Sequence, residues 1–244
     1  MQLLGDALSP PRCAACDLAV PRDHAFCAPC AASVERCSAE DFSPRLAEGA
    51  DGEPTAVDVA FAHYGGALAT AIRRLKYEDK PYLARPLGDL LRSACRAREI
   101  RADAVLPVPL HPRRLVERGY NQAALLAAHV AREIGAPLVT KALTRRIDTA
   151  PQVELSGARR RANLATAMAV TSPASVEGRV LALVDDVSTT GATLEACRRA
   201  LLASGARRVI GVVLARTTPG ALGSPLGLDT GAVLDIGDGR VRAS

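Results

Sequence analysis

The sequence contains no tryptophan and has only three phenylalanines and four tyrosines. Its core must therefore be built from Leu, Val and Ala, and a binding surface of stacked aromatic rings is disfavoured. No apolar run approaches the roughly 18 residues of a membrane span, so we predict a protein without one. The first residues lack the basic-then-apolar layout of a signal peptide, from which we expect a cytoplasmic location.

Two common nucleotide-binding loops are also missing. The chain has neither GxxxxGK(S/T) nor a GxGxxG that follows a strand, so it shows no sign of a P-loop or a dinucleotide-binding Rossmann domain. What it has in excess is arginine, which supplies almost all of the positive charge behind a net charge of +5. This excess favours an anionic ligand or nucleic acid, but a genome rich in Ala, Arg and Gly explains it equally well.

Five of the seven cysteines lie within the first 37 residues. Four of them form two Cys-x2-Cys pairs: Cys13, Cys16, Cys27 and Cys30. Four thiolates can enclose Zn²⁺ tetrahedrally, and such a closed site is structural because no coordination position stays open. We therefore predict a zinc-ribbon-like module with its linker in residues 1–50, the polar linker continuing to residue 56. His24 and Cys37 are alternative ligands, and a redox Cys-x2-Cys pair is the competing interpretation.

The most informative stretch is residues 180–194. Its first five residues, 180–184, are all apolar and suit a strand that is covered on both faces of a parallel sheet. Asp185 and Asp186 follow where this strand is predicted to end, at the edge where ligands of open α/β sheets bind. The helix that comes next has an apolar stripe and is closed by Gly205.

Hydroxyl groups and a glycine connect the acidic pair to that helix. Together with the free N–H groups of the helix N-terminus they predict a phosphate cradle. Two adjacent carboxylates would repel a bare polyphosphate, but they suit vicinal sugar hydroxyls or a hydrated Mg²⁺. A ribose 5-phosphate combines both features. The residues expected around it are Val187, Ser188, Thr189, Thr190, Gly191, Ala192 and Thr193. The competing interpretation is a helix that is merely capped by Asp186 or Ser188.

At these residues the sequence resembles the phosphoribosyltransferase family, whose signature is an apolar strand, two acids and then Thr-Gly-x-Thr. The resemblance implies an open, mostly parallel α/β sheet of the type I phosphoribosyltransferase class over residues 57–217. It also implies that Asp185 and Asp186 hold the ribose diol of phosphoribosyl pyrophosphate and that residues 189–193 wrap its 5-phosphate. Purine-salvage members place an aspartate where this chain has Thr189, which argues against purine salvage.

A second strand, predicted over residues 103–110, ends in prolines and precedes three arginines, Arg113, Arg114 and Arg118. Arginine offers paired planar donors to phosphate oxygens, so three arginines next to a rigid turn at a sheet edge suit a pyrophosphate clamp. An exposed basic turn without function is the alternative. Another basic group, Arg73, Arg74 and Lys76, ends the helix predicted after residue 65, and there solvated charge that complements the helix dipole is a sufficient explanation.

The motif that begins Pro107-Val108-Pro109-Leu110 and continues with Arg114-x3-Arg118-Gly-Tyr-Asn-Gln resembles the ComF family of competence-associated, phosphoribosyltransferase-like proteins. Tyr120 stands where that family usually has phenylalanine. The resemblance implies an N-terminal zinc module with four cysteine ligands, Mg²⁺ as the partner of the donor, and a role in DNA uptake. It further implies that the diphosphate lies near Val108, Pro109, Leu110, Arg113, Arg114 and Arg118.

Residues 140–168 lack a clean period, and long polar connections in compact domains are usually functional or mobile. Thr149, Gln152, Arg160 and Asn163 again resemble ComF positions and are candidate lid contacts, although a solvated arginine-rich face is the alternative. We expect the tail, residues 218–244, to be poorly ordered.

Two functions of different class follow. One is an enzyme that displaces pyrophosphate from phosphoribosyl pyrophosphate in favour of an acceptor that the sequence does not identify. The other is a DNA-uptake factor whose zinc module and arginine-rich loops grip the backbone of single-stranded DNA, with the uptake machinery as a further partner. The sequence leaves a homodimer open in either case.

Overall fold

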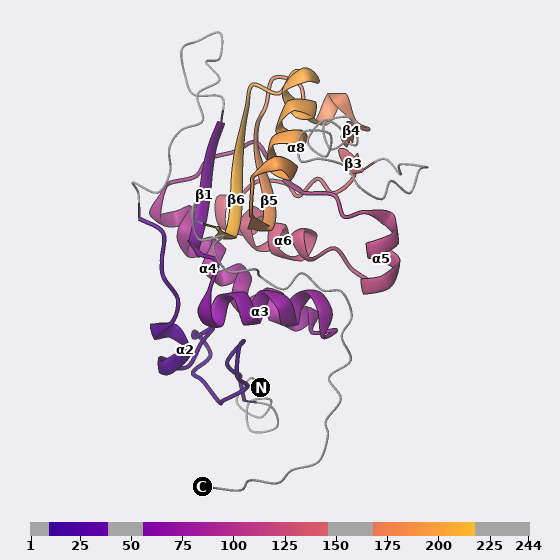
Figure 1. Ribbon diagram of the computed structural model, residues 1–244. Helices are drawn as coiled ribbons and strands as arrows, with labels where there is room; N and C mark the ends of the chain where they lie inside the picture. The colour runs from indigo at the N-terminus through magenta and orange to yellow at the C-terminus, as the bar shows by residue number, and fades with distance from the viewer. Residues whose placement is uncertain (1–9, 39–55, 146–167, 218–244) are drawn as a thin grey trace, which may run out of the picture.

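The computed structural model describes residues 10–38, 56–145 and 168–217, and it centres on a parallel sheet (Figure 1). The strand order is β1 (Ala56–His63), β6 (Arg208–Arg216), β5 (Val180–Ser188) and β2 (Ala104–Pro107), and every pair is parallel. A single bridge from Leu138 to Val105 extends the β2 edge. The α/β class predicted from the sequence is confirmed.

Both faces of the sheet are covered, as the unbroken apolar run in β5 predicts. Helices α4 (Ala84–Ala97) and α6 (Gln122–Ile134) pack on one face, and α8 (Ala192–Ala203) packs on the other. The first layer of core contains Ala182, Val184, Leu87, Leu91, Leu126 and Val130. The second contains Leu181, Leu183, Leu194, Cys197 and Leu201. Successive strand residues alternate between the layers because side chains alternate along a strand.

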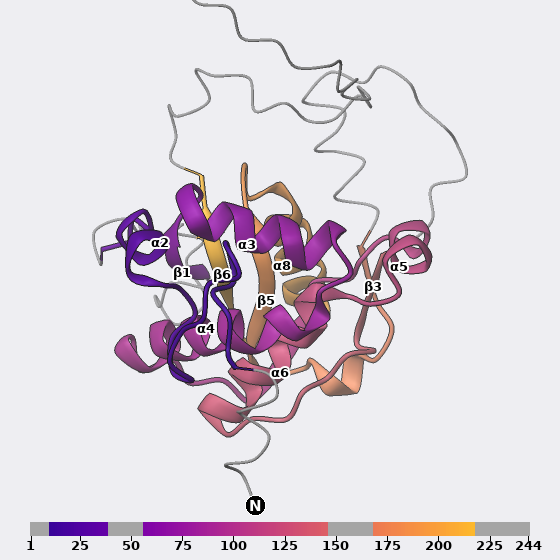
Figure 2. The ribbon, with the colours of Figure 1, turned by 90° about the horizontal axis from the view of Figure 1, so that it is seen from below.

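Helix α3 (Gly66–Tyr77) runs beneath the carboxyl ends of the strands, as both ribbon views show (Figures 1 and 2). Leu68, Ile72 and Leu75 are fully buried and anchor it to the core. A short 3-10 turn, η1 (Pro81–Leu83), joins it to α4. The helix therefore lies at the edge of the sheet where ligands of such folds bind.

The basic segment after β2 is a helix, α5 (Pro112–Arg118), which was not predicted, and the alternative of an exposed basic turn does not hold for it. Pro112 stands at its first position, His111 Nδ1 accepts a hydrogen bond from the Arg113 amide at 3.2 Å, and Gly119 ends it with a φ of 78°. These are the start and stop features of a helix, in a segment too short to show a period. The preceding strand ends at Pro107, earlier than predicted.

A small antiparallel pair lies beside α8. It consists of β3 (Leu143–Arg145) and β4 (Met168–Val170), followed by a 3-10 turn, η2 (Pro173–Ser175). The predicted lid residues Thr149, Gln152, Arg160 and Asn163 lie outside the described residues, between these two strands in the chain. The predicted tail, 218–244, and most of the predicted linker are likewise outside them.

The N-terminal segment 10–38 contains one short helix, α2 (Ala28–Ala32), and packs on the first core layer. Cys13, Ala14 and Phe26 belong to the same buried cluster as Leu68 of α3. Its last residues pair antiparallel with β1, because the Cys37 amide donates to the Phe61 carbonyl at 3.2 Å. Within the three described ranges, no helix is long and apolar enough to cross a membrane.

Candidate functional site

The two carboxylates lie inside β5 and not beyond its end. The strand continues to Ser188 because β6 pairs with it through Asp185↔Val213 and Ser188↔Arg216. The predicted strand end was therefore too early. Side chains on a strand alternate, so Asp185 and Asp186 point to opposite faces. Asp185 is half-buried, and its Oδ1 accepts a hydrogen bond from the Asp186 amide at 2.8 Å.

Asp186 is almost completely buried, with 2% of its surface exposed. Its ionic partner is Lys76 of α3, whose Nζ lies 2.9 Å from Asp186 Oδ2. Burial by itself lowers the pKa of Lys76, but the attraction of Asp186 and Asp185 outweighs it and raises the pKa. The interpretation of Lys76 as solvated charge was therefore wrong.

Asp185 has an unusual acidity for a carboxyl group. Burial and repulsion by Asp186 raise its pKa to about 8, against a smaller lowering by Lys76. The Lys76 ammonium thus balances the Asp186 carboxylate, and Asp185, on the other face of the strand, holds a proton below about pH 8. An arrangement of this kind can accept hydrogen bonds from sugar hydroxyls or attract a cation that arrives with a ligand.

The turn between β5 and α8 encloses a small hollow. Its walls are Asp185, Val187, Ser188, Thr189, Thr190, Gly191, Ala192, Thr193 and Leu194. Gly191 has a φ of 74°, which side chains rarely adopt, and this conformation turns the chain into α8. The N-cap is Gly191, and no side chain caps the helix, so Asp186 and Ser188 do not act as its caps.

The amide groups of this turn are open to a ligand. Among the described residues, the hydrogen bonds leave the N–H groups of Thr190, Gly191 and Thr193 without an acceptor, and only Ala192 N reaches the Thr190 hydroxyl, at 3.4 Å. The carbonyls behind the turn are held by Thr217, whose amide and hydroxyl bond Ser188 and Thr189. A turn with free amides at the start of a 12-residue helix suits an anion.

The strand β2 brings the predicted diphosphate segment to the same edge. Because Pro107 pairs with Val184, Val108 lies level with Asp185. Val108 is buried, its amide bonds the Val184 carbonyl at 2.8 Å, and its carbonyl accepts from Asn121 Nδ2 at 3.0 Å. Pro109 and Leu110, both half-buried, continue from there into α5.

The three predicted arginines occupy different surroundings. Arg118 donates to Gln122 Oε1, and its guanidinium lies over the Tyr77 ring, 5.3 Å from the centroid. It thus stands next to the end of α3 that carries Lys76. Arg113 is exposed and paired with Glu117 at 3.1 Å along α5, and Arg114 is exposed. In the part of the chain that the structure describes, Arg118 alone of the three is tied to α3.

The rest of that motif fastens α5 and α6 to their surroundings. The Tyr120 hydroxyl donates to the Leu75 carbonyl of α3. Asn121 caps α6, because its Oδ1 accepts from the Ala123 amide at 3.0 Å. These two residues therefore hold the arginine-bearing segment against α3.

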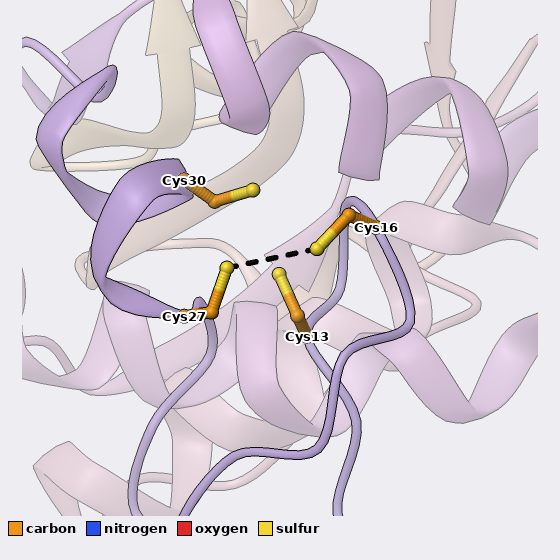
Figure 3. A group of neighbouring side chains, drawn as sticks. All are labelled: Cys13, Cys16, Cys27 and Cys30. Carbon is orange, nitrogen blue, oxygen red and sulfur yellow. Dashed lines mark hydrogen bonds between the residues drawn. The ribbon is translucent and has the colours of Figure 1, made fainter.

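The four predicted zinc ligands converge (Figure 3). The thiol sulfurs of Cys13, Cys16, Cys27 and Cys30 all lie within 4.8 Å of one another, and the Cys16 and Cys27 sulfurs are 3.6 Å apart. Zn–S bonds of about 2.3 Å in a tetrahedron place sulfurs about 3.8 Å apart, so the group fits a structural zinc ion. Neither His24, which pairs with Asp23 at 2.9 Å, nor Cys37 belongs to the group.

The ion pairs of Lys76 and Arg74 were not predicted from the sequence, which was interpreted as placing both side chains in solvent. A signal was present, since Lys76 continues the stripe of Leu68 and Ile72 at four-residue steps, and Arg74 continues that of Ala67 and Ala71. A charged residue on a buried helix stripe must find a partner, and both of these do.

The fold and this site together define the class of protein. A parallel sheet carries an acidic pair at its carboxyl edge, followed by a Thr-Gly-x-Thr turn and a helix. A model of the phosphoribosyl transferase domain matches residues 121–223. The chain therefore contains a domain of the type I phosphoribosyltransferase class.

Sequence similarity to individual proteins identifies the family within this class. Competence protein F of Haemophilus influenzae is 35% identical over 157 residues, which cover 62% of this chain and 69% of that protein. The DNA utilization protein YhgH of Escherichia coli O157:H7 is 36% identical over 164 residues, 65% of this chain and 71% of that protein. The chain belongs to the ComF family of phosphoribosyltransferase-like proteins.

Similarity to solved structures is weaker. The allosteric regulatory enzyme of purine biosynthesis has a TM-score of 0.40 and 20% identity, and the match covers 54% of this chain and 26% of that one. This likeness is too low to carry an argument about function.

Proposed function

We propose that the chain binds phosphoribosyl pyrophosphate together with Mg²⁺ at the carboxyl edge of the sheet. The observation that carries the proposal is the placement of two neighbouring acidic residues directly before a turn whose amides have no acceptor among the described residues. Carboxylates and free amides select opposite charges, so a ligand that fits both must present hydroxyls to one and phosphate to the other.

Each part of the donor has a matching group. The turn at residues 188–193 takes the 5-phosphate through amide and hydroxyl donors, helped by the dipole of α8. Asp185 and Asp186 take the vicinal hydroxyls of the ribose. The backbone beside Val108, which is level with Asp185, and the guanidinium of Arg118, next to the end of α3, are the groups that we assign to the diphosphate. Mg²⁺, a hard cation, accompanies the diphosphate and neutralises part of its charge.

Transfer of the phosphoribosyl group is the reaction that such a site would serve. The bond between the ribose C1 and the diphosphate oxygen breaks, and a nucleophilic acceptor forms the new bond at C1. The chain's own contribution is to orient the donor and to stabilise the charge of the departing diphosphate. A screen for pyrophosphate release with candidate acceptors, in wild type and in Asp186→Asn, tests this step.

Isothermal titration calorimetry of the full chain with phosphoribosyl pyrophosphate, with and without Mg²⁺, tests the binding proposal. We expect Mg²⁺-dependent binding in wild type and a loss of at least about tenfold in Asp185→Asn/Asp186→Asn. Asp89→Asn, on the distant helix α4, is the matched control and keeps wild-type affinity. Equal affinity in wild type and the double variant would remove the site assignment.

Single-stranded DNA is the second candidate ligand, in line with the names of the relatives. The specific observation is that Tyr77 and Tyr82 are 67% and 61% exposed and that Arg118 lies over the Tyr77 ring. An exposed ring beside a guanidinium can stack on a base. Tyr77→Ala should weaken salt-dependent binding of an oligonucleotide by about tenfold or more. Tyr64→Ala is the comparison, because Tyr64 is half-buried and follows directly after β1.

A further inference from the structure

We propose that Lys76 is a positioning residue of the candidate sugar-phosphate site and that the cysteine module holds it in place through helix α3. The inference rests on the proposed donor binding and assigns to that site a residue and a supporting module. Its starting point is the 2.9 Å separation between Lys76 Nζ and Asp186 Oδ2.

Asp186 depends on this single cation. Its Oδ2 atom is buried, and the Lys76 ammonium at 2.9 Å is the contact that compensates its charge. A buried carboxylate that loses its partner either takes up a proton or turns away. In both cases it can no longer accept a hydrogen bond from a ligand hydroxyl in the same place. Lys76 is thus required for the shape and charge of the pair.

Two further cations, Arg145 and Arg198, act on Cys197, but among the described residues neither forms an ion pair with Asp185 or Asp186. Asp185 is the neighbouring carboxylate on β5, and Tyr77 follows Lys76 on α3. On the α8 side, Cys197 lies near Asp185. Among the described residues, Lys76 is the one cation that forms an ion pair with either carboxylate. The position of α3 therefore decides whether the carboxylates are compensated.

Helix α3 is held at both ends by the N-terminal module. At its start, the Ser33 hydroxyl accepts a hydrogen bond from the Ala67 amide at 3.0 Å. Gly66 has a φ of 50°, and an added Cβ there would lie 2.2 Å from the Ser33 carbonyl oxygen, so module and helix are in close backbone contact. Figure 2 shows α2 against the start of α3.

Near the other end, Arg74 reaches into the module. It is 4% exposed, and its Nη1 donates to the Ala14 carbonyl at 2.9 Å, within the Cys13-x2-Cys16 turn. Its Nη2 pairs with Asp17, and its Nε pairs with Glu78 at 3.2 Å. Arg74 stands two residues before Lys76. The cysteine turn thus binds Arg74 of α3, and Asp186 binds Lys76, which lies about half a helical turn further along the same helix.

The first experiment titrates Mg²⁺ and phosphoribosyl pyrophosphate into four full-length proteins, with melting temperatures recorded separately. We expect Lys76→Met to bind at least about tenfold more weakly and Lys76→Arg to recover most of the affinity. Arg73→Met removes an exposed cation from the same helix and is expected to bind as wild type. If Lys76 acted only on stability, the melting temperature of Lys76→Met would fall, but its affinity for the donor would not drop selectively and be restored in Lys76→Arg.

The outcomes separate the two proposals. If wild type does not bind the donor, the proposed function fails, and the role of Lys76 fails with it. If wild type binds and Lys76→Met binds equally well, only the inference about Lys76 is overturned. That inference is also overturned if Lys76→Arg loses as much affinity as Lys76→Met, because a retained cation should retain the effect.

The second experiment tests the module's part. Arg74→Met, and the milder Asp17→Asn, cut the tie between the cysteine turn and α3. We expect a several-fold weaker affinity for the donor while bound zinc, measured by elemental analysis, is retained. Combined with Lys76→Met, neither change should weaken binding further, because both act through one residue. Wild-type affinity in both single variants, or losses that multiply, would show that the module does not position Lys76.

Discussion

Arg198 of α8 crosses over β6 to pair with Asp58 of β1, and it can do so only because Gly211 lies between them. Arg198 is 3% exposed, and Glu195 is its second partner at 2.9 Å. A Cβ added to Gly211 would lie 2.3 Å from Asp58 Oδ1. The glycine in this strand therefore makes room for the ion pair between the buried Arg198 and the partly exposed Asp58.

Gly211→Ala should accordingly lower the free energy of unfolding by about 1–3 kcal/mol, because the added methyl group must displace the Asp58 carboxylate from a buried arginine. Chemical denaturation measures the change. Gly65→Ala is the matched control, since nothing lies within 4 Å of a Cβ there and its backbone is extended, and we expect little change. Equal stability of both variants would contradict the role of Gly211.

Stability should depend on pH through Asp185. Its pKa is raised by burial and by Asp186 to about 8, whereas an unfolded aspartate has a pKa of about 4. Between these values the folded state binds more protons than the unfolded state, so the stability contribution is fully present below about pH 4 and is lost as the pH rises through about 8. Denaturant titrations at pH 5, 6.5 and 8 should show a steeper decline in wild type than in Asp185→Asn. Parallel curves would show that Asp185 does not titrate in this range.

Zinc should be bound by four cysteines and by no fifth one. Cys16→Ser is expected to lose most of the bound metal and to lower the melting temperature, because a segment this small relies on the ion for its fold. Cys37→Ser lies outside the group and should retain about one zinc per chain. Elemental analysis of purified proteins measures both. Full zinc content in Cys16→Ser would exclude the four-cysteine site.

The arginines near α5 should contribute unequally to donor binding. Arg118 lies over Tyr77 beside the end of α3, whereas Arg113 is 83% exposed and paired with Glu117. We expect Arg118→Met to weaken binding of phosphoribosyl pyrophosphate about tenfold or more and Arg113→Met to weaken it less than about twofold. The opposite ranking in calorimetric titrations would place the diphosphate on the outer side of α5.

Several features could be predicted from the sequence because their cause is local. The apolar run of β5, the Thr-Gly-x-Thr turn and the apolar stripe of α8 are contiguous, and the structure confirms the strand and the helix. The four-cysteine group could be predicted for the same reason, since the short spacing within each Cys-x2-Cys pair limits the distance between its two sulfurs. The short helix α5 escaped prediction because seven residues are too few for a period to appear.

The order of residues sets the chemical groups on each segment: an acidic pair before a hydroxyl-rich turn, four thiols, and arginines after a second strand. The contact of Lys76 with Asp186, the contact of Arg74 with the cysteine turn, and the extension of β5 past its acids to pair with β6 arise from the folded arrangement alone. The physical reason is that burial of a charge depends on which helix face meets which strand end. The packing of the whole core determines which helix face meets which strand end, and the residues adjacent in the sequence do not.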